Sequence, residues 1–279
     1  MIAPLAIPKS VAAPDPIFDD FLAGGPLTTA DVVDCHSHLG PALYMQGADT
    51  DADSLVQYLD ALGVGLACVS HSIAMVSDWQ IGNTLLIDAV RLHPGRIFGY
   101  AFFNPRYPSS MPAELDRCIA AGLRGLKAHP DFHQTPADAP AYDYLYERAS
   151  EENRVILCHY GAGPGRYAGA ALWKRVVDRF PRATYVMAHS LPGRGAVDLA
   201  VEYFGTRDNV FFCLANAFEP GVIEYAAERL GAERLLYGSD GCWGAMATRL
   251  GIVCSTRLDD TAKRLVLGGN MHRLLSQVA

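Results

Sequence analysis

Short apolar runs alternate with amphipathic stretches along almost the whole chain. Apolar runs bounded by glycine, proline or polar residues predict strands, and apolar residues at helical spacing predict helices. Strands are predicted over Val32–His38, Leu66–His71, Ile97–Asn104, Leu123–His129, Val155–His159, Thr184–His189, Val210–Asn216 and Leu235–Asp240. Helices are predicted over Ala52–Gly63, Ile81–Leu92, Pro112–Ala121, Tyr142–Glu152, Ala171–Phe180, Ala196–Phe204, Gly221–Leu230, Thr261–Leu267 and, after an interruption at Gly268–Gly269, Met271–Leu275.

The strands and helices alternate eight times, with successive strand ends roughly 30 residues apart, as βα units require. An open doubly wound sheet is the alternative arrangement. A closed barrel is favoured because all its parallel strands finish on one rim, which brings polar residues at the strand ends together. The sequence therefore predicts an α/β protein with a (β/α)8 TIM barrel. We expect residues 1–28 to form an irregular N-terminal arm and residues 29–279 to form the single barrel domain.

Composition narrows the classes of function. The chain has 279 residues, of which 50% are hydrophobic, and its formal net charge is −7. Without a basic run, this charge repels a phosphate backbone, so nucleic acid is excluded as a partner. No apolar run reaches the length of a membrane span, and seven cysteines without CxxC spacing fit a reducing compartment, so we expect a cytoplasmic protein. The arm is compatible with a homodimer.

The predicted strands end in side chains that bind metals. Five strands end in histidine and the last ends in aspartate: His38, His71, His129, His159, His189 and Asp240. His36 and His38 share a face of their strand because side chains two apart point the same way. Imidazole and carboxylate groups suit Zn²⁺ and related ions such as Mn²⁺ and Fe²⁺. We predict one divalent ion, with zinc as the first choice, and interpret His71 as a core residue.

The motifs that contain these residues resemble the amidohydrolase superfamily, in particular its amidohydrolase-related branch. They are Asp34-Cys35-His36-Ser37-His38-Leu39-Gly40, Gly125-Leu126-Lys127-Ala128-His129-Pro130, Cys158-His159-Tyr160-Gly161, Ala188-His189, Tyr237-Gly238-Ser239-Asp240 and Gly269-Asn270-Met271-His272-Arg273-Leu274-Leu275. The resemblance covers roughly residues 30–275 and implies a metal-dependent barrel enzyme. By position it implies that His36, His38 and His159 are metal ligands, that Asp240 is both ligand and general base, and that His189 binds the metal or polarises a substrate carbonyl.

The resemblance leaves two reactions open. The branch contains hydrolases of amides, esters and lactones, and also non-oxidative decarboxylases of aromatic or unsaturated acids. Since decarboxylases of the branch are typically longer, the compact chain favours a hydrolase of a small amide, ester or lactone. In that reaction metal-activated water attacks the carbonyl with Asp240 as general base. Decarboxylation is the alternative, and a small molecule is the expected partner in both.

Further residues are candidates for substrate binding. Lys127 shares a face with His129, two residues on, so both should face the barrel interior; we interpret Lys127 as bound to substrate or to a carboxylate rather than as a carboxylated bridge between two metals. Arg166 follows strand five in a glycine-rich loop and suits a substrate carboxylate, with Arg194 as a second candidate. Trp243, three residues after Asp240, could form a wall for an apolar substrate.

Two other classes of function are less consistent with the sequence. A metal-dependent nuclease of related fold would carry a carboxylate at the end of strand four, where this chain has Lys127 and His129. A barrel that serves only as a binding protein is not excluded by fold alone. The complete set of histidines and Asp240 argues against it.

Overall fold

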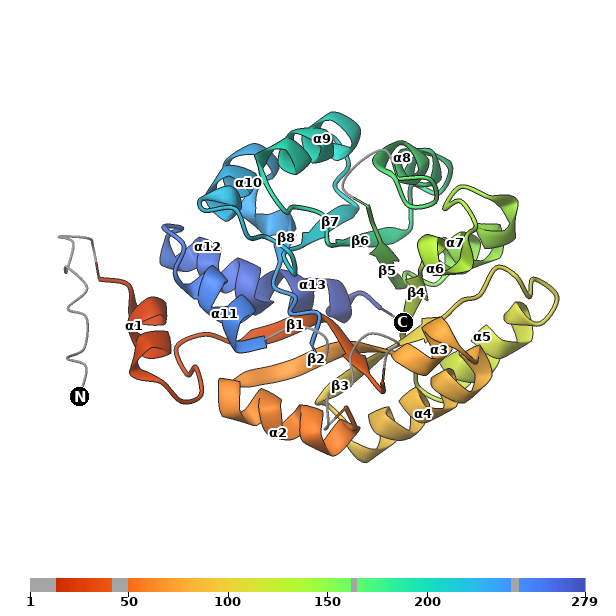
Figure 1. Ribbon diagram of the computed structural model, residues 1–279, viewed down its shortest axis with the longest axis horizontal. Coiled ribbons are helices and arrows are strands. Elements are labelled where there is room, and N and C mark those ends of the chain that lie inside the picture. Colours follow the sequence, from red (N-terminus) through yellow and green to blue (C-terminus); the bar gives the residue numbers. More distant parts are fainter. Residues whose placement is uncertain (1–13, 42–49, 162–164, 242–245, 279) are drawn as a thin grey trace.

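The computed structural model describes residues 14–41, 50–161, 165–241 and 246–278. These residues contain one eight-stranded sheet in which the strands follow one another in chain order and neighbouring strands are parallel. Its strands are β1 (Val32–Leu39), β2 (Val64–His71), β3 (Ile97–Phe102), β4 (Gly125–Ala128), β5 (Val155–His159), β6 (Thr184–Ala188), β7 (Val210–Cys213) and β8 (Leu235–Leu236). With helices outside the ring of strands, this order confirms the predicted (β/α)8 barrel (Figure 1).

The helices cover the outside of the barrel and its ends (Figure 1). They are α1 (Pro16–Ala23), α2 (Ala52–Leu62), α3 (Ser72–Val76), α4 (Trp79–Leu92), α5 (Met111–Ala120), α6 (Pro130–His133), η1 (Pro140–Tyr142), α7 (Asp143–Glu151), α8 (Ala170–Arg179), α9 (Arg194–Phe204), α10 (Val222–Leu230), η2 (Ala232–Arg234), α11 (Met246–Cys254), α12 (Asp260–Arg264), η3 (Leu265–Gly269) and α13 (Asn270–Ser276). The short helices α3 and α6 and the longer α11 occupy regions that the sequence predicted to be loops after the strands.

Several strands end earlier than the sequence predicts. β6 ends at Ala188 and β8 at Leu236, so His189 and Asp240 follow the strands instead of closing them. Both residues have a φ of 57°, in the left-handed region that non-glycine residues rarely adopt. An extended strand cannot pass through such a residue, which explains the early end of β6. Backbone strain of this kind is most often found at functional sites.

The barrel closes between β1 and the segment that follows β8. Cys35 donates its backbone N–H to Tyr237 O at 3.0 Å, and Asp240 donates to His36 O at 2.8 Å. His38 donates to Gly241 O at 3.0 Å. These bonds place Asp240, the last predicted strand residue, directly beside the two histidines of the first strand. The seam of the barrel is therefore also the position at which the candidate metal ligands meet.

A register shift in β1 decides which side chains face inward. The pairing of β1 with β2 slips between Asp34 and Ser37. Val33 and Cys35 pack in the barrel interior, and after the shift His36 and His38 line a cavity at the mouth. A local bulge that re-aims a side chain is a common device next to active sites. The predicted shared face of His36 and His38 is thus confirmed.

Two apolar layers hold the barrel together. The interior is filled by side chains such as Tyr100, Leu157 and Val186, and a larger layer lies between the strands and the helices. Tyr100 donates its hydroxyl to Cys35 O at 3.1 Å, which satisfies the polar atom of a ring that is fully buried. This packed interior gives the strand ends a rigid base.

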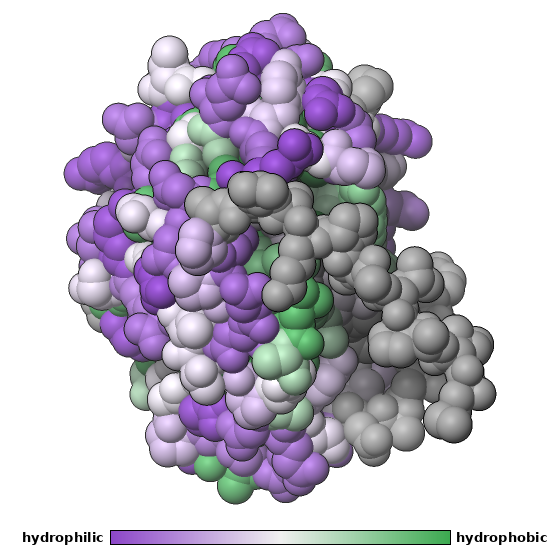
Figure 2. All heavy atoms as spheres, turned by 90° about the vertical axis from the view of Figure 1, so that its left-hand side faces the viewer, coloured by the Kyte–Doolittle hydropathy of each residue, from purple (hydrophilic) through white to green (hydrophobic). Residues whose placement is uncertain are grey.

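The predicted N-terminal arm includes one helix among its described residues. Asp15 accepts from Phe18 N at 3.1 Å and begins α1, which contacts α11 and α12. Lys263 is fully buried and donates to Asp15 and to Cys254 O, so a charged contact fixes this helix to the C-terminal part of the barrel. The face that carries α1 is mostly hydrophilic, with hydrophobic residues in small areas (Figure 2).

The predicted break at Gly268–Gly269 is wrong. The chain continues from α12 into α13 through the π-helical turn η3. A Cβ at Gly268 would lie 2.4 Å from Asp31 O, so glycine is needed there for close approach to the start of β1. Within the described residues, no helix combines the length and apolar character that a membrane span requires.

Candidate metal centre

A cavity of about 190 Å³ lies at the carboxyl ends of the strands. It is lined by His36, His38, Met75, Lys127, His129, Phe132, His159 and His189. Five of these residues are histidines from β1, β5 and the segments after β4 and β6. Because all parallel strands of a barrel end on the same rim, imidazoles that are spread over 150 positions of the sequence lie together in this cavity.

Three of the imidazoles converge on one carboxylate oxygen. Asp240 Oδ1 lies 3.2 Å from His38 Nε2, 3.5 Å from His36 Nε2 and 3.9 Å from His189 Nε2. The Nε2 atoms of His36 and His38 are 3.1 Å apart. One ligand atom each from His36, His189 and Asp240 lies within 4.8 Å of the others. This is the donor set, imidazole nitrogen and carboxylate oxygen, that first-row divalent ions prefer.

The protonation states also suit a cation. Burial lowers the pKa of His36 well below the ordinary imidazole value and lowers that of His189 to about 4, so both rings are neutral near pH 7. Burial alone would raise the pKa of Asp240, but the adjacent imidazoles, His36 first, hold it well below the ordinary value. A metal requires neutral imidazoles and an ionised carboxylate, and these residues provide both. The residues fit a divalent ion.

His159 lies in the same cavity but is held by different neighbours. Its ring stacks on His129, with centroids 3.8 Å apart and planes at 14°, and its Nε2 is 3.4 Å from Asp131 Oδ2. The ring centroids of His159 and His189 are 5.3 Å apart. His129 in turn accepts from Phe132 N at 3.3 Å and so begins α6. The structure therefore groups His189, more closely than His159, with the residues of the first strand.

A buried carboxylate that the sequence analysis did not select supports the cluster from below. Asp34 is fully buried and accepts from the backbone N–H groups of His36 and Ser239, both at 3.0 Å. Its other oxygen accepts from the hydroxyls of Ser37, at 2.6 Å, and Ser239. Asp34 thus connects β1 with the segment that carries Asp240. Asp34 stands at the start of the Asp-Cys-His-Ser-His motif, and this position was the feature of the sequence that could have identified it as a site residue.

Two more polar residues orient the histidines. Ser70 Oγ lies 3.1 Å from His38 Nδ1, which leaves Nε2 for the cluster. Asn216 donates from its side chain to His189 O at 2.8 Å and fixes the strained residue after β6. Because Ser70 and Asn216 stand near strand ends without a titratable group, nothing in the sequence marked them.

Lys127 is the one Lys or Arg among the described residues that line the cavity. Its side chain is only 1% exposed and, among the described residues, it has no ion pair. Burial lowers its pKa to about 8, so it is still largely protonated at pH 7. Lys127 and His129 both face the interior, as their spacing predicts. A buried ammonium that faces a cavity without a carboxylate in contact is suited to bind an anion.

The remaining predicted residues lie outside the cavity wall or outside the described chain. Arg166 is exposed, with its guanidinium carbon 5.1 Å from the centre of the Tyr167 ring. Arg194 is also exposed and is paired with Glu219 at 2.5 Å. His71 is buried at the end of β2 and accepts from Ile73 N, which agrees with a core role. Trp243 falls outside the described residues.

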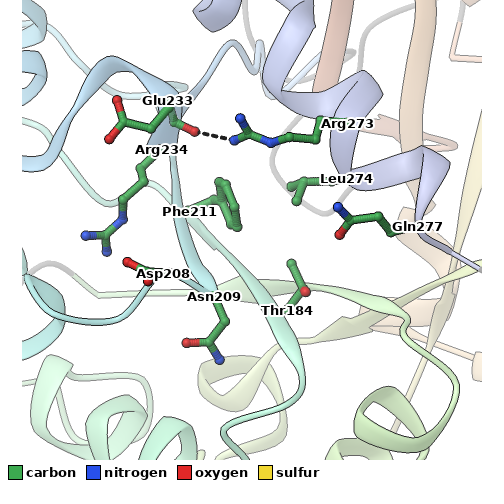
Figure 3. A pocket seen from close by; sticks show the side chains of 9 residues that line it. All are labelled: Thr184, Asp208, Asn209, Phe211, Glu233, Arg234, Arg273, Leu274 and Gln277. Atoms are coloured by element: carbon green, nitrogen blue, oxygen red, sulfur yellow. Dashed lines mark hydrogen bonds between the residues drawn. The ribbon is translucent and has the colours of Figure 1, made fainter.

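A larger cavity of about 450 Å³ lies at the opposite end of the barrel (Figure 3). It is lined by Thr184, Asp208, Asn209, Phe211, Glu233, Arg234, Arg273, Leu274 and Gln277. Arg234 donates to three backbone carbonyls, and Arg273 donates to Glu233 O at 2.8 Å. Arg234 and Arg273 thus use their N–H donors to stabilise the amino-terminal end of the barrel, where polar residues usually contribute to stability.

Comparisons with known proteins identify a family and a fold. The sequence model of a family described as "Amidohydrolase" matches residues 33–276. No curated protein sequence matched the chain.

Solved structures share the fold at low sequence identity. The 5-carboxyvanillate decarboxylase LigW from Sphingomonas paucimobilis has a TM-score of 0.69 at 17% identity, over 90% of this chain and 100% of its own. The 2,6-dihydroxybenzoate decarboxylase from Rhizobium has a TM-score of 0.70 at 16% identity, over 88% and 99%. A 5-carboxyvanillate decarboxylase from Novosphingobium aromaticivorans, solved with manganese and 4-hydroxy-3-methoxy-5-nitrobenzoic acid, has a TM-score of 0.68 at 13% identity, over 88% and 96%.

Proposed function

This chain belongs to the amidohydrolase family, and we propose that within it the chain is a metal-dependent decarboxylase of a small aromatic or unsaturated acid. The observation that carries the proposal is Lys127, an ammonium that lines the cavity and has no ion pair among the described residues. An acid offers such a cation a negatively charged partner, whereas a neutral amide, ester or lactone offers only a carbonyl oxygen. The fold shared with decarboxylases of aromatic acids supports the same reaction.

The length of the chain does not favour a hydrolase over a decarboxylase, contrary to the expectation from the sequence. This chain aligns over 96% to 100% of three decarboxylase structures, so it is not a shortened version of them. The cavity of about 190 Å³ is smaller than a typical drug-sized pocket. A single-ring acid is therefore the substrate class that we propose, in place of the hydrolase substrates favoured by the sequence.

We assign the residues as follows. His36, His38, His189 and Asp240 would hold the divalent ion, with His159 as a further ligand on substrate binding. When bound, the ion supplies positive charge that draws the acid into the site and stabilises negative charge as it develops. Manganese is our first choice of ion, because a structural neighbour carries it, and zinc and iron satisfy the same donor set.

In the proposed reaction Lys127 Nζ binds and neutralises an oxygen of the acid, and His129 packs beside it to exclude water. The bond between the carboxyl carbon and the substrate carbon breaks, and carbon dioxide leaves. The electron pair stays on the substrate carbon, which then takes a proton. The acid enters as a carboxylate, so the proton that the substrate carbon takes comes from water; Asp240, which is ionised in the resting site, would accept that proton and deliver it from a carboxylate oxygen.

The test is a product assay on the full-length protein supplied with Mn²⁺ or Zn²⁺. Carboxyl-labelled 2-hydroxybenzoate, 2,6-dihydroxybenzoate and 5-carboxyvanillate are compared with a panel of lactones and N-acyl compounds. We expect labelled carbon dioxide from at least one acid, and one deuterium on the vacated carbon when the reaction runs in D2O. Asp240→Asn is the inactive control, and Arg194→Gln, on the exposed rim, is the active one. Turnover of lactones or amides without carbon dioxide would restore the hydrolase interpretation.

A further inference from the structure

Arg249 is a second cation near the mouth of the barrel, and no carboxylate of the described residues forms an ion pair with it. It lies on α11, nine residues after Asp240, and its Nη1 is buried without a hydrogen-bond partner among the described residues. Its guanidinium carbon lies 3.9 Å from the centre of the Phe218 ring. A guanidinium stacked on an aromatic face keeps its edge N–H groups available for bonds in its own plane. That edge is the part that recognises carboxylates.

The location of Arg249 connects it to the candidate metal centre. The charge of Arg249 is close enough to interact with that of Asp240, and Phe218, the ring on which Arg249 stacks, lies in the segment that follows β7. Phe218 stands two residues after Asn216, which donates to His189 O and whose own Oδ1 is buried without a partner. Near the ends of β6, β7 and β8, the donor Arg249 Nη1 and the acceptor Asn216 Oδ1 therefore both lack a hydrogen-bond partner among the described residues.

Two other arginines in this half of the barrel are already paired. Arg194 bonds to Glu219 at 2.5 Å and Arg229 bonds to Asp198 at 3.0 Å, both at the exposed surface. Arg249 differs because no such carboxylate contacts it within the described chain. An N–H donor that is buried without an acceptor costs free energy, so a ligand that accepts from Nη1 would stabilise this arrangement.

We propose that Arg249, stacked on Phe218, forms an anion subsite that binds a second carboxylate of the substrate. This subsite deepens the proposed function and rests on it, because Lys127 and the metal would hold the carboxylate that is lost. Arg249 would hold the other carboxylate of the same substrate. Lys127, Arg249 and a divalent ion would outweigh the two nearby carboxylates, Asp240 and Asp131, in a chain whose overall charge is −7. A dianionic acid offsets this local excess of positive charge, and Asn216 Oδ1 is available to accept from a hydroxyl or a protonated carboxyl of the same ligand.

The experiment compares ligands that differ by one carboxylate. Full-length protein supplied with Mn²⁺ is titrated by calorimetry with benzoate and with the 1,2-, 1,3- and 1,4-benzenedicarboxylates. We expect wild-type protein to bind at least one diacid at least about tenfold more tightly than benzoate, as a desolvated charged pair allows. Arg249→Gln should remove this preference and leave the Kd for benzoate within about twofold. Arg194→Gln, the matched rim arginine with its own acidic partner, should behave like wild type.

The outcomes separate this proposal from the proposed function. A wild-type protein without a diacid preference, or an unchanged preference in Arg249→Gln, overturns the subsite even if aromatic acids are decarboxylated. A diacid preference that depends on Arg249 supports the subsite even if no acid releases carbon dioxide. Should Arg249→Gln fail to fold, Arg249→Lys gives the answer: the charge stays but the planar fork is lost, so an unchanged diacid preference would overturn a role for paired N–H donors.

Discussion

Asp34→Asn should make the protein more stable at pH 7, although it replaces a residue below the metal cluster. Asp34 Oδ1 accepts from two backbone N–H groups, and an asparagine carbonyl can accept from both. The other oxygen accepts from the hydroxyls of Ser37 and Ser239, which can turn and accept from the asparagine NH2 instead. The substitution therefore keeps the hydrogen bonds and removes a buried charge.

The magnitude follows from the pKa of Asp34. Burial raises this pKa from an ordinary 3.8 to about 6, since hydrogen bonds from Ser239 and Ser37 offset only part of the desolvation. A raised carboxylate pKa means that folding favours the protonated form, so the ionised side chain costs about 3 kcal/mol at pH 7. That cost falls as pH drops through 6 and is about half as large at pH 5. Asp34→Asn should thus raise the free energy of unfolding by about 1–3 kcal/mol at pH 7 and by roughly half of that at pH 5.

Urea unfolding of chelator-treated protein at the two pH values measures this change. The matched control is Asp178→Asn: this carboxylate is on the surface and paired with Lys174 and Arg207, so its loss should destabilise the fold by no more than about 1 kcal/mol. The reasoning is refuted if Asp34→Asn destabilises the protein by more than 1 kcal/mol or if its effect does not depend on pH.

The other predictions concern the cluster itself. His36→Ala should leave the circular dichroism spectrum intact, abolish turnover and reduce the metal content to less than half that of wild type; normal metal content with residual turnover would count against His36 as a ligand. Asp240→Asn should retain most of the ion yet lower kcat by roughly 10²- to 10⁴-fold, and an unaltered pH profile would remove Asp240 from proton transfer. Because the pKa of Lys127 is about 8, kcat/KM for an acid substrate should fall above pH 8 as the ammonium loses its proton, and Lys127→Met should lack this limb of the profile.

Much of the fold was readable from the sequence, because hydrophobic periodicity and the spacing of strand ends depend on local chemistry. The barrel, its strand order and the shared faces of His36 with His38 and of Lys127 with His129 are all as expected. The helices α3, α6 and α11 were not foreseen, because their short apolar patterns follow strand ends where loops are the usual choice.

The fine geometry of the site could not be read from the sequence. Whether His159 or His189 approaches Asp240 depends on stacking against His129 and on the left-handed backbone of His189, and neither leaves a mark in a single sequence. Arg166 carried the right chemistry in a glycine-rich loop, yet it lies at the surface. Arg249 carried the same chemistry without any motif, and its position on a helix that was not predicted kept it hidden.

Anomalous diffraction from crystals grown with Mn²⁺ tests the central claim most directly, since it locates the ion without reference to activity. The account predicts one anomalous peak within bonding distance of imidazole nitrogens from His36 and His38 and of an oxygen from Asp240. A protein that takes up Mn²⁺ elsewhere, or that shows no peak among these three side chains at saturating metal, would contradict it.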